Sequence, residues 1–217
     1  MPRRLPVYLV LDTSGSMTGE AIEATDTGLS LLLQALRNDP NALETAWLSI
    51  ITFDSSARQI VPLTELEQFQ PPTLQARGTT EMGAALELLA DSINREVVKN
   101  SQSQKGDWKP MVILITDGQP TDDIRNGVER LRQIKPAMTI CCGVGPNAKF
   151  DVLEHIADGV APPEKRAVVK LETADRASLI ALFKWLSSSA SSTIRQSIEA
   201  QNNSQILPPP PPEIIVL

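Results

Sequence analysis

The sequence predicts an α/β protein with a doubly wound, mostly parallel sheet of six strands, one antiparallel edge strand, and helices on both faces. Short apolar runs alternate along the 217 residues with segments in which apolar residues recur at helical spacing. Two of these runs, 7–11 and 111–115, lack the polar alternation of a half-exposed strand. Continuous apolar runs are typical of parallel strands buried on both faces, and their alternation with helices indicates a doubly wound sheet.

The first half of the chain supplies the centre and one edge of this sheet. Residues 5–12 are expected to form the central strand, followed by a helix from Met17 to Arg37 that ends at Asn38-Asp39-Pro40. Residues 46–53 read as a second buried strand. The turn that follows, Asp54-Ser55-Ser56, pairs it with an antiparallel edge strand at 57–61.

The second half repeats the strand and helix pattern on the other side. Strands are expected at 111–116, 137–144 and 167–171, and helices at 81–98, 124–133, 150–157 and 178–187. Thr121 or Asp122 is expected to cap the helix at 124–133. Lys99 to Lys109 is polar and contains a glycine, which predicts a surface loop.

The domain organisation follows from a shift in composition near residue 190. Residues 1–190 are predicted to form one domain, and 191–217 a Ser- and Pro-rich C-terminal tail. Five consecutive prolines favour an extended polyproline II conformation. Two interpretations stay open: a disordered tail, or a docking segment in which the apolar residues 214–217 add a strand to a sheet edge.

Composition limits the function classes. A net charge of −6 argues against general binding to nucleic acids or anionic membranes. The chain has 41% hydrophobic residues but no apolar run of 18 residues, so we expect no transmembrane helix. The amino-terminal segment lacks the pattern of a signal peptide, and a cytoplasmic protein is the expectation.

The two cysteines are neighbours in a predicted strand. Side chains of Cys141 and Cys142 should point to opposite faces, which disfavours a bridge between them. They also lack the C-x-x-C spacing of a zinc or redox site. We expect two buried thiols that pack as small hydrophobic groups; soft-metal chemistry at the pair is the alternative.

Oxygen-bearing side chains follow the first strand directly. Asp12, Ser14 and Ser16 lie in the tight turn that leads from the strand into the helix, and Gly15 lets the backbone fold back. Ligands in parallel α/β proteins bind at the carboxyl ends of strands. One carboxylate and two hydroxyls are hard ligands, so the turn predicts a site for Mg²⁺, Mn²⁺ or Ca²⁺.

Two later loops can complete such a site. Thr79 and Thr80 open the helix at 81–98, and the spacing to Gly83 favours Thr80 as the ligand. Asp117 ends the strand at 111–116 and is followed by Gly118, which permits a tight turn.

These three motifs resemble those of the von Willebrand factor type A (VWA) domain with a complete metal-ion-dependent adhesion site (MIDAS). Asp12, Ser14 and Ser16 match its first motif, Thr80 its second and Asp117 its third, in the same order. The resemblance implies that the hydroxyls of Ser14, Ser16 and Thr80 bind the metal directly. It also implies that Asp12 and Asp117 act through water or by bonding those hydroxyls.

A closer resemblance is to the bacterial TerY-like VWA proteins, which are associated with tellurium resistance and general stress. The segments 3–17, 48–54 and 62–66 are similar to theirs. The cysteine-rich zinc module that some of these relatives carry is not found in this sequence. The resemblance implies a role in stress or tellurium-resistance machinery, with a kinase or phosphatase of the same system as the partner.

The predicted function is metal-dependent protein binding by a monomer. A cation held by neutral hydroxyls stays electron-poor, so a partner's Asp or Glu can complete its coordination shell. A scaffold with a purely structural metal is the alternative.

Catalysis is not expected. A Mg²⁺-dependent phosphotransfer enzyme of the aspartyl type needs a second acid two residues after Asp12, where this chain has Ser14. The chain also lacks a phosphate-binding Gly-Lys-Ser/Thr loop and a G-x-S-x-G motif.

Overall fold

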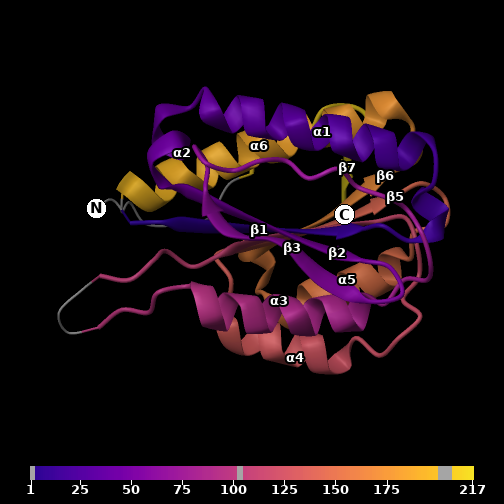
Figure 1. Cartoon of the computed structure of the whole chain (residues 1–217), viewed down its shortest axis with the longest axis horizontal. Helices are drawn as coiled ribbons and strands as arrows, with labels where there is room; N and C mark the ends of the chain where they lie inside the picture. The colour runs from indigo at the N-terminus through magenta and orange to yellow at the C-terminus, as the bar shows by residue number, and fades with distance from the viewer. Residues whose placement is uncertain (1–2, 102–104, 200–206) are drawn as a thin grey trace.

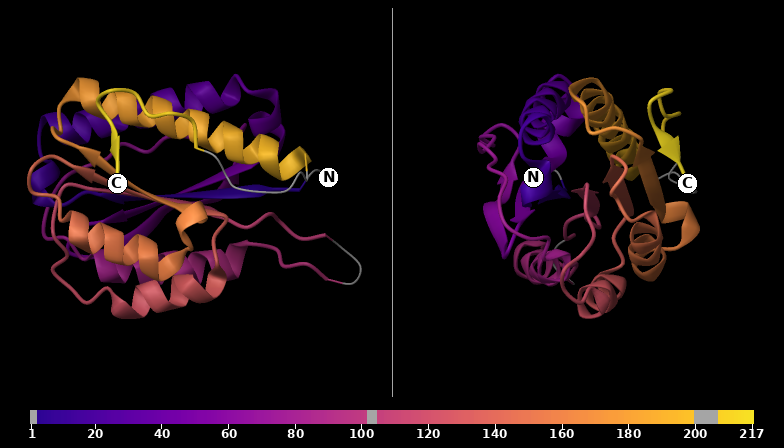
Figure 2. Two further views of the ribbon diagram at one scale, coloured as in Figure 1. Left: turned by 180° about the vertical axis from the view of Figure 1, so that it is seen from behind. Right: turned by 90° about the vertical axis from the view of Figure 1, so that its right-hand side faces the viewer.

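The computed structural model describes residues 3–101, 105–199 and 207–217. The strands are β1 (Leu5–Asp12), β2 (Ala46–Phe53), β3 (Ala57–Glu65), β4 (Met111–Thr116), β5 (Met138–Val144), β6 (Arg166–Leu171) and β7 (Ile215–Val216). The helices are α1 (Glu20–Arg37), α2 (Pro40–Thr45), α3 (Met82–Glu96), α4 (Arg125–Ile134), α5 (Phe150–Val160) and α6 (Arg176–Glu199), with 3₁₀ turns η1 (Gly15–Met17) and η2 (Pro163–Lys165). The sheet lies between two helical layers, α1, α2 and α6 on one face and α3, α4 and α5 on the other (Figure 1, Figure 2).

The strand order is β3-β2-β1-β4-β5-β6-β7. β1 pairs in parallel with both β2 and β4, and β5 and β6 continue the parallel sheet. The chain therefore builds outward from β1 on one side and then from β4 on the other, which makes the β1–β4 junction the topological switch point. Ligands bind at such a junction in open α/β sheets, because the loops that leave the two strands diverge there.

All six predicted strands are present, and the tail adds a seventh. β3 is antiparallel to β2 as predicted, and β7 is antiparallel to β6, so the sheet has an antiparallel strand at each edge. β3 also runs four residues beyond the predicted end at Val61. None of the described helices is long and apolar enough to cross a membrane.

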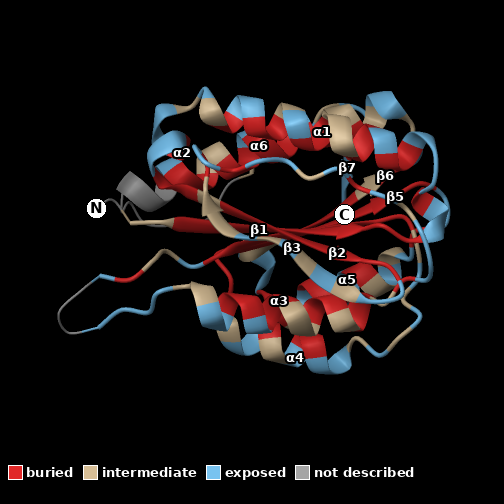
Figure 3. Cartoon of the chain, viewed as in Figure 1, coloured by how far each residue is buried: buried red, intermediate tan, exposed pale blue. Residues whose placement is uncertain are grey.

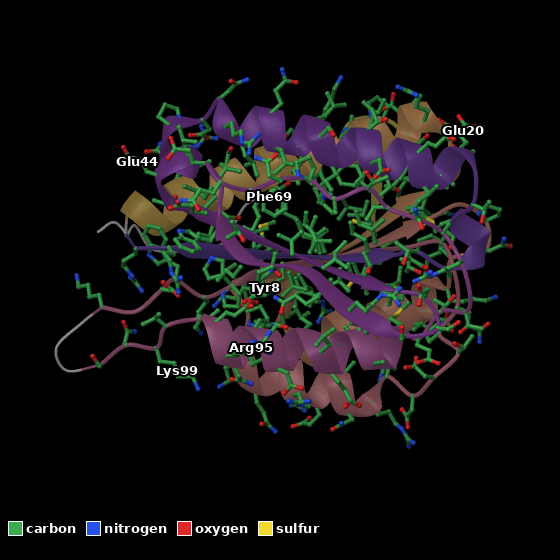
Figure 4. All side chains as sticks on the ribbon, in the orientation of Figure 1. Tyr8, Glu20, Glu44, Phe69, Arg95 and Lys99 are labelled. Carbon is green, nitrogen blue, oxygen red and sulfur yellow. The ribbon has the colours of Figure 1, made fainter. Side chains whose placement is uncertain are left out.

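The core consists of two apolar layers, one on each face of the sheet. Alternate residues of β1 enter different layers: Leu9 and Leu11 pack with α1 and α6, while Tyr8 and Val10 pack with α3. Figure 4 shows Phe69 on the first face and Tyr8 on the second. Figure 3 shows that the inner strands are buried along most of their length, as their continuous apolar runs predict, whereas the edge strand β3 is not.

The neighbouring cysteines are buried in different layers. Cys141 faces the α3–α4–α5 layer and Cys142 the α1–α6 layer, and both are free thiols. Burial raises the pKa of Cys141 to about 12 and also raises that of Cys142. The prediction of two opposed, buried thiols is confirmed.

Asn38-Asp39-Pro40 ends α1 as predicted, and a second helix that the sequence analysis did not predict begins at once. Pro40 is the first residue of α2, where its missing N–H costs nothing. The Asp39 side chain accepts hydrogen bonds from the backbone amides of Asn41 and Ala42. The same three residues therefore end one helix and cap the next.

The last helix is longer than predicted and crosses the expected domain boundary at residue 190. In the serine-rich run the hydroxyls bond back to carbonyls of the preceding helical turn, as Ser189 does with Trp185 and Thr193 with Ser189, so they are satisfied within the helix. Ala190 and Ile194 are buried against the domain. Composition alone was a poor guide to the boundary here.

The described end of the tail, 207–217, packs on its own domain. Trp185 Nε1 donates to the Pro208 carbonyl at 2.9 Å, and Ile214 is buried. The Leu217 amide donates to the Val168 carbonyl, which extends the short ladder between β6 and β7. Of the two interpretations of the tail, the docking segment applies to residues 207–217, which add a strand to an edge of the chain's own sheet. Residues 200–206 of the predicted tail lie outside the described residues.

Candidate metal site

The first motif forms a turn held by its own aspartate. Asp12 is the last residue of β1, and its Oδ1 accepts a hydrogen bond from the Ser14 amide at 2.8 Å. Ser14 then starts the 3₁₀ turn η1, which places the Ser16 hydroxyl 3.0 Å from the Ser14 hydroxyl. The turn therefore presents two hydroxyl oxygens side by side.

The third motif joins the first directly. The register of β1 and β4 pairs Leu11 with Ile115, so the next residues, Asp12 and Thr116, leave the two strands together. The Thr116 hydroxyl donates to Asp12 Oδ2 at 2.5 Å. One residue later, Asp117 Oδ1 accepts a hydrogen bond from the Ser16 hydroxyl at 2.7 Å. Side chains about one hundred residues apart in sequence thus share one network across the switch point.

The second motif closes the site from the α3 side. A Cβ placed on Gly118 would lie 3.4 Å from Thr80 Oγ1 and 3.8 Å from Asp12 Oδ2, so both oxygens border the same point. The Thr80 carbonyl accepts a hydrogen bond from the Thr121 amide, which fixes this loop to the one after β4. Thr79 points elsewhere, because its hydroxyl bonds Ser55.

A glycine makes the approach of these loops possible. Gly78 has φ of +71°, and a Cβ there would lie 2.3 Å from the Ser55 hydroxyl. Its carbonyl accepts a hydrogen bond from the Gly15 amide at 3.0 Å. Positive φ and close packing both favour glycine, so the first and second motifs depend on this residue for their contact.

The arrangement fits a hard divalent cation. Bonds of roughly 2.1 Å to octahedral Mg²⁺ set adjacent oxygens roughly 3 Å apart, and the Ser14 and Ser16 hydroxyls have that spacing at 3.0 Å. In the described part of the chain, no three His, Cys, Asp or Glu side chains cluster as a metal site. The candidate site is therefore one of hydroxyls supported by two carboxylates, Asp12 and Asp117, which suits Mg²⁺ and not zinc.

The site has a buried floor and an open rim. Asp12 and Ser14 are each 1% exposed and Asp117 is 8% exposed, whereas Ser16 is exposed. Burial raises the pKa of both Asp12 and Asp117, although hydrogen bonds from Ser14 and Thr116 oppose the rise at Asp12 and one from Ser16 opposes it at Asp117. A cation bound at the rim would stabilise both carboxylates in their ionised form.

Sequence reasoning missed two residues that hold the site together. Thr116 positions Asp12. Its role could be recognised only from the register of two parallel strands, and that register cannot be read from the sequence. Thr121 or Asp122 was expected to cap α4, but that helix has no side-chain cap, and the Asp122 carboxylate accepts hydrogen bonds from the amides of Gly83 and Ala84 at the start of α3. It therefore links the second and third motifs.

Comparisons with known proteins agree with this architecture. The family model of the von Willebrand factor type A domain matches residues 7–181. Human inter-alpha-trypsin inhibitor heavy chain H6 is 24% identical over 176 residues, which cover 72% of this chain and 13% of that protein. The chain thus spans a small part of that relative's length.

Two solved structures show the same fold at low identity. A von Willebrand factor type A protein from Catenulispora acidiphila superposes with a TM-score of 0.65 at 18% identity, covering 88% of this chain and 43% of that chain. The ArnB paralog VWA2 from Sulfolobus acidocaldarius gives a TM-score of 0.61 at 18% identity, covering 87% and 45%. Because the family model matches most of this chain, residues 7–181, the chain belongs to the von Willebrand factor type A domain family.

Proposed function

We propose that this chain is a divalent-metal-dependent protein-binding module that captures an acidic side chain of its partner. The metal, Mg²⁺ or else Mn²⁺ or Ca²⁺, would be held by Ser14, Ser16 and Thr80 with Asp12 and Asp117 behind them. A cation bound there would supply an electron-poor centre with room for an outside carboxylate. The observation that carries the proposal is the single hydrogen-bonded network of hydroxyls and carboxylates from different loops.

In this proposal some side chains orient the metal-binding turn, and others lie where the partner approaches. Both oxygens of Asp12 are occupied, one by the Ser14 amide and one by the Thr116 hydroxyl. Its carboxylate therefore orients the turn and lends the site negative charge, as outer-shell groups do in metal sites. The exposed Ser16 lies at the rim, where a partner can approach. The chain in this proposal binds and does not catalyse.

The biological setting rests on the resemblance to TerY-like proteins. This part of the proposal is a cytoplasmic role in stress or tellurium-resistance machinery. A kinase or phosphatase of that system would present the Asp or Glu. The analogy concerns the setting alone, because folds of this kind host many functions.

The test is capture of partners by the immobilised chain in Mg²⁺ and in excess EDTA, with bound proteins identified by mass spectrometry. We expect a partner retained in Mg²⁺, released by EDTA and lost with Asp12→Ala. Asp151→Ala, an exposed acid on α5, is the matched control and should retain it. A partner that binds equally well in EDTA would contradict bridging by metal, and a chain stabilised by metal without metal-dependent capture would favour the structural-metal alternative.

A further inference from the structure

A basic cavity lies at the opposite end of the sheet from the candidate metal site. Its volume is about 480 Å³, and it is bordered by the segments that precede β4, β5 and β6 and by the ends of α4 and α5. Five of the chain's 20 lysines and arginines line it, against one acid, Asp158. The basic residues are Lys109, Arg132, Lys135, Lys165 and Arg166. This concentration of positive charge occurs in a chain whose net charge is −6.

The topology brings the lysines together. Lys109, Lys135 and Lys165 each lie one to three residues before a strand, and those three strands, β4, β5 and β6, are parallel neighbours. Parallel strands in register start at the same edge of the sheet. Three ammonium groups from distant parts of the sequence therefore reach one edge.

Most of this charge has no internal partner. Among the ion pairs of the described residues, none involves Lys109, Lys135 or Lys165. Arg166 pairs with Asp158, and Arg132 reaches Glu129 only at 3.9 Å. The three lysines therefore leave an uncompensated positive potential over the cavity.

Helix ends explain only part of the cluster. The carbonyl end of α4 attracts cations, which accounts for Arg132 and Lys135, but Lys109 follows a loop and Lys165 ends a single 3₁₀ turn. Lys135 also has φ of +56°, and it is the one non-glycine residue with positive φ in the described part of the chain. Glycine or asparagine is favoured at such a helix end, so lysine keeps its charge there against its backbone preference.

We propose that this cavity binds a small, phosphate-dense anion through Lys109, Lys135 and Lys165. Its volume is that of a small-molecule site, and lysine ammonium groups bind phosphate oxygens as point charges. The described lining contains no aromatic ring on which a base could stack, so the phosphate chain itself is the recognised part. A free oligophosphate and the phosphates of a nucleotide share this chemistry.

The test is calorimetric titration of the full chain with inorganic tripolyphosphate, in buffer freed of divalent metals so that the candidate metal site takes no part. We expect saturable 1:1 binding. The triple variant K109Q/K135Q/K165Q should weaken it by about tenfold or more. The control K99Q/K149Q/K184Q makes the same change in charge outside the cavity and should stay within about twofold. No binding by the natural chain, or an equal loss in both triple variants, would overturn the proposal.

Two further arms separate the ligand's source from the residue's structural role. ATP should bind about as well as tripolyphosphate; binding of ATP without tripolyphosphate would mean recognition of the base and would overturn the proposal. Lys135→Asn removes a charge and suits a left-handed backbone, so it should raise the Tm while weakening tripolyphosphate binding several-fold. Unchanged affinity in Lys135→Asn would remove this residue from the site and contradict the assignment.

Discussion

A single buried carboxylate, Asp54, and a pair of them, Asp12 and Asp117, lie at the carboxyl end of the sheet and differ in what compensates their charge. Burial raises the pKa of Asp54, after β2, but hydrogen bonds from Arg77 and Arg58 outweigh it and leave the pKa below its usual range. Among the described residues, Asp12 and Asp117 receive hydrogen bonds only from hydroxyls and backbone amides, and burial leaves both pKa values raised. One acid is neutralised by the chain itself, and the other two are not.

The difference originates in the loops. Arg58 lies four residues after Asp54 across the β2–β3 turn, and Arg77 comes from the segment before α3. The three loops of the candidate site, 13–19, 78–81 and 117–121, contain no lysine or arginine. A cation from outside is therefore the group that can offset the charge of Asp12 and Asp117.

The largest expected effect is stabilisation by metal. At a Mg²⁺ concentration one hundred times its Kd, binding should stabilise the fold by about 2.7 kcal/mol. For a chain of this size that raises the Tm by roughly 5–10 °C, measured by circular dichroism in Mg²⁺ against EDTA. Asp117→Asn should lose most of the shift. An identical shift in Asp12→Ala would place the metal somewhere else.

Asp54→Asn tests the carboxylate whose charge is compensated by two arginines. It should destabilise the protein by about 1–3 kcal/mol, measured by urea unfolding, because two guanidinium groups lose their carboxylate. The cost is below that of a fully buried pair, since the side chains of Arg58 and Arg77 are 43% and 64% exposed. The gain in Tm from Mg²⁺ should be unchanged in this variant. Loss of that gain would show that the two groups are coupled.

The smallest expected effect is that of Asp117→Asn on stability in the absence of metal, and this effect is a stabilisation. In metal-free buffer the substitution removes an uncompensated buried charge, so we expect stabilisation of up to about 1 kcal/mol. The folded pKa of Asp117 is raised, so the natural chain loses stability as pH rises through that pKa, and the variant's advantage should appear over the same range. Below the unfolded pKa the two proteins should be equally stable.

Asp54 titrates in the other direction. Its folded pKa is lowered, so its contribution is present above the unfolded pKa and is lost as pH falls through the folded pKa. The loss of unfolding free energy caused by Asp54→Asn should therefore become smaller in acid. The gain of unfolding free energy caused by Asp117→Asn should become smaller there as well. Parallel urea titrations of both variants between pH 3 and about pH 7 measure the two trends. A deficit that grows in acid would reverse the assignment for Asp54.

Local patterns predicted the fold class and the residues of the candidate site. Continuous apolar runs set the bounds of β2 and β4, and the polar residues that follow the strands marked the loops that meet. These signals are carried by neighbours in the sequence, so one chain suffices to read them. The choice of Thr80 over Thr79 agrees with the hydroxyl of Thr79 facing Ser55.

What escaped prediction depends on contacts between distant segments. Nothing near Asp122 indicates that it caps α3 and not its own helix, and the bond from Thr116 to Asp12 needs the strand register. The helical serines before Ala190 resemble a linker until the burial of Ile194 is known. Tertiary packing decided these cases against local preference.

The two thiols of β5 offer an internal reporter on how the molecule comes apart. Cys141 and Cys142 are fully buried, on opposite faces of a central strand, and their raised pKa values keep them protonated at neutral pH. An alkylating reagent therefore reaches each one only when the helical layer that covers it has separated from the sheet. The order in which the two neighbours become labelled records which layer detaches first.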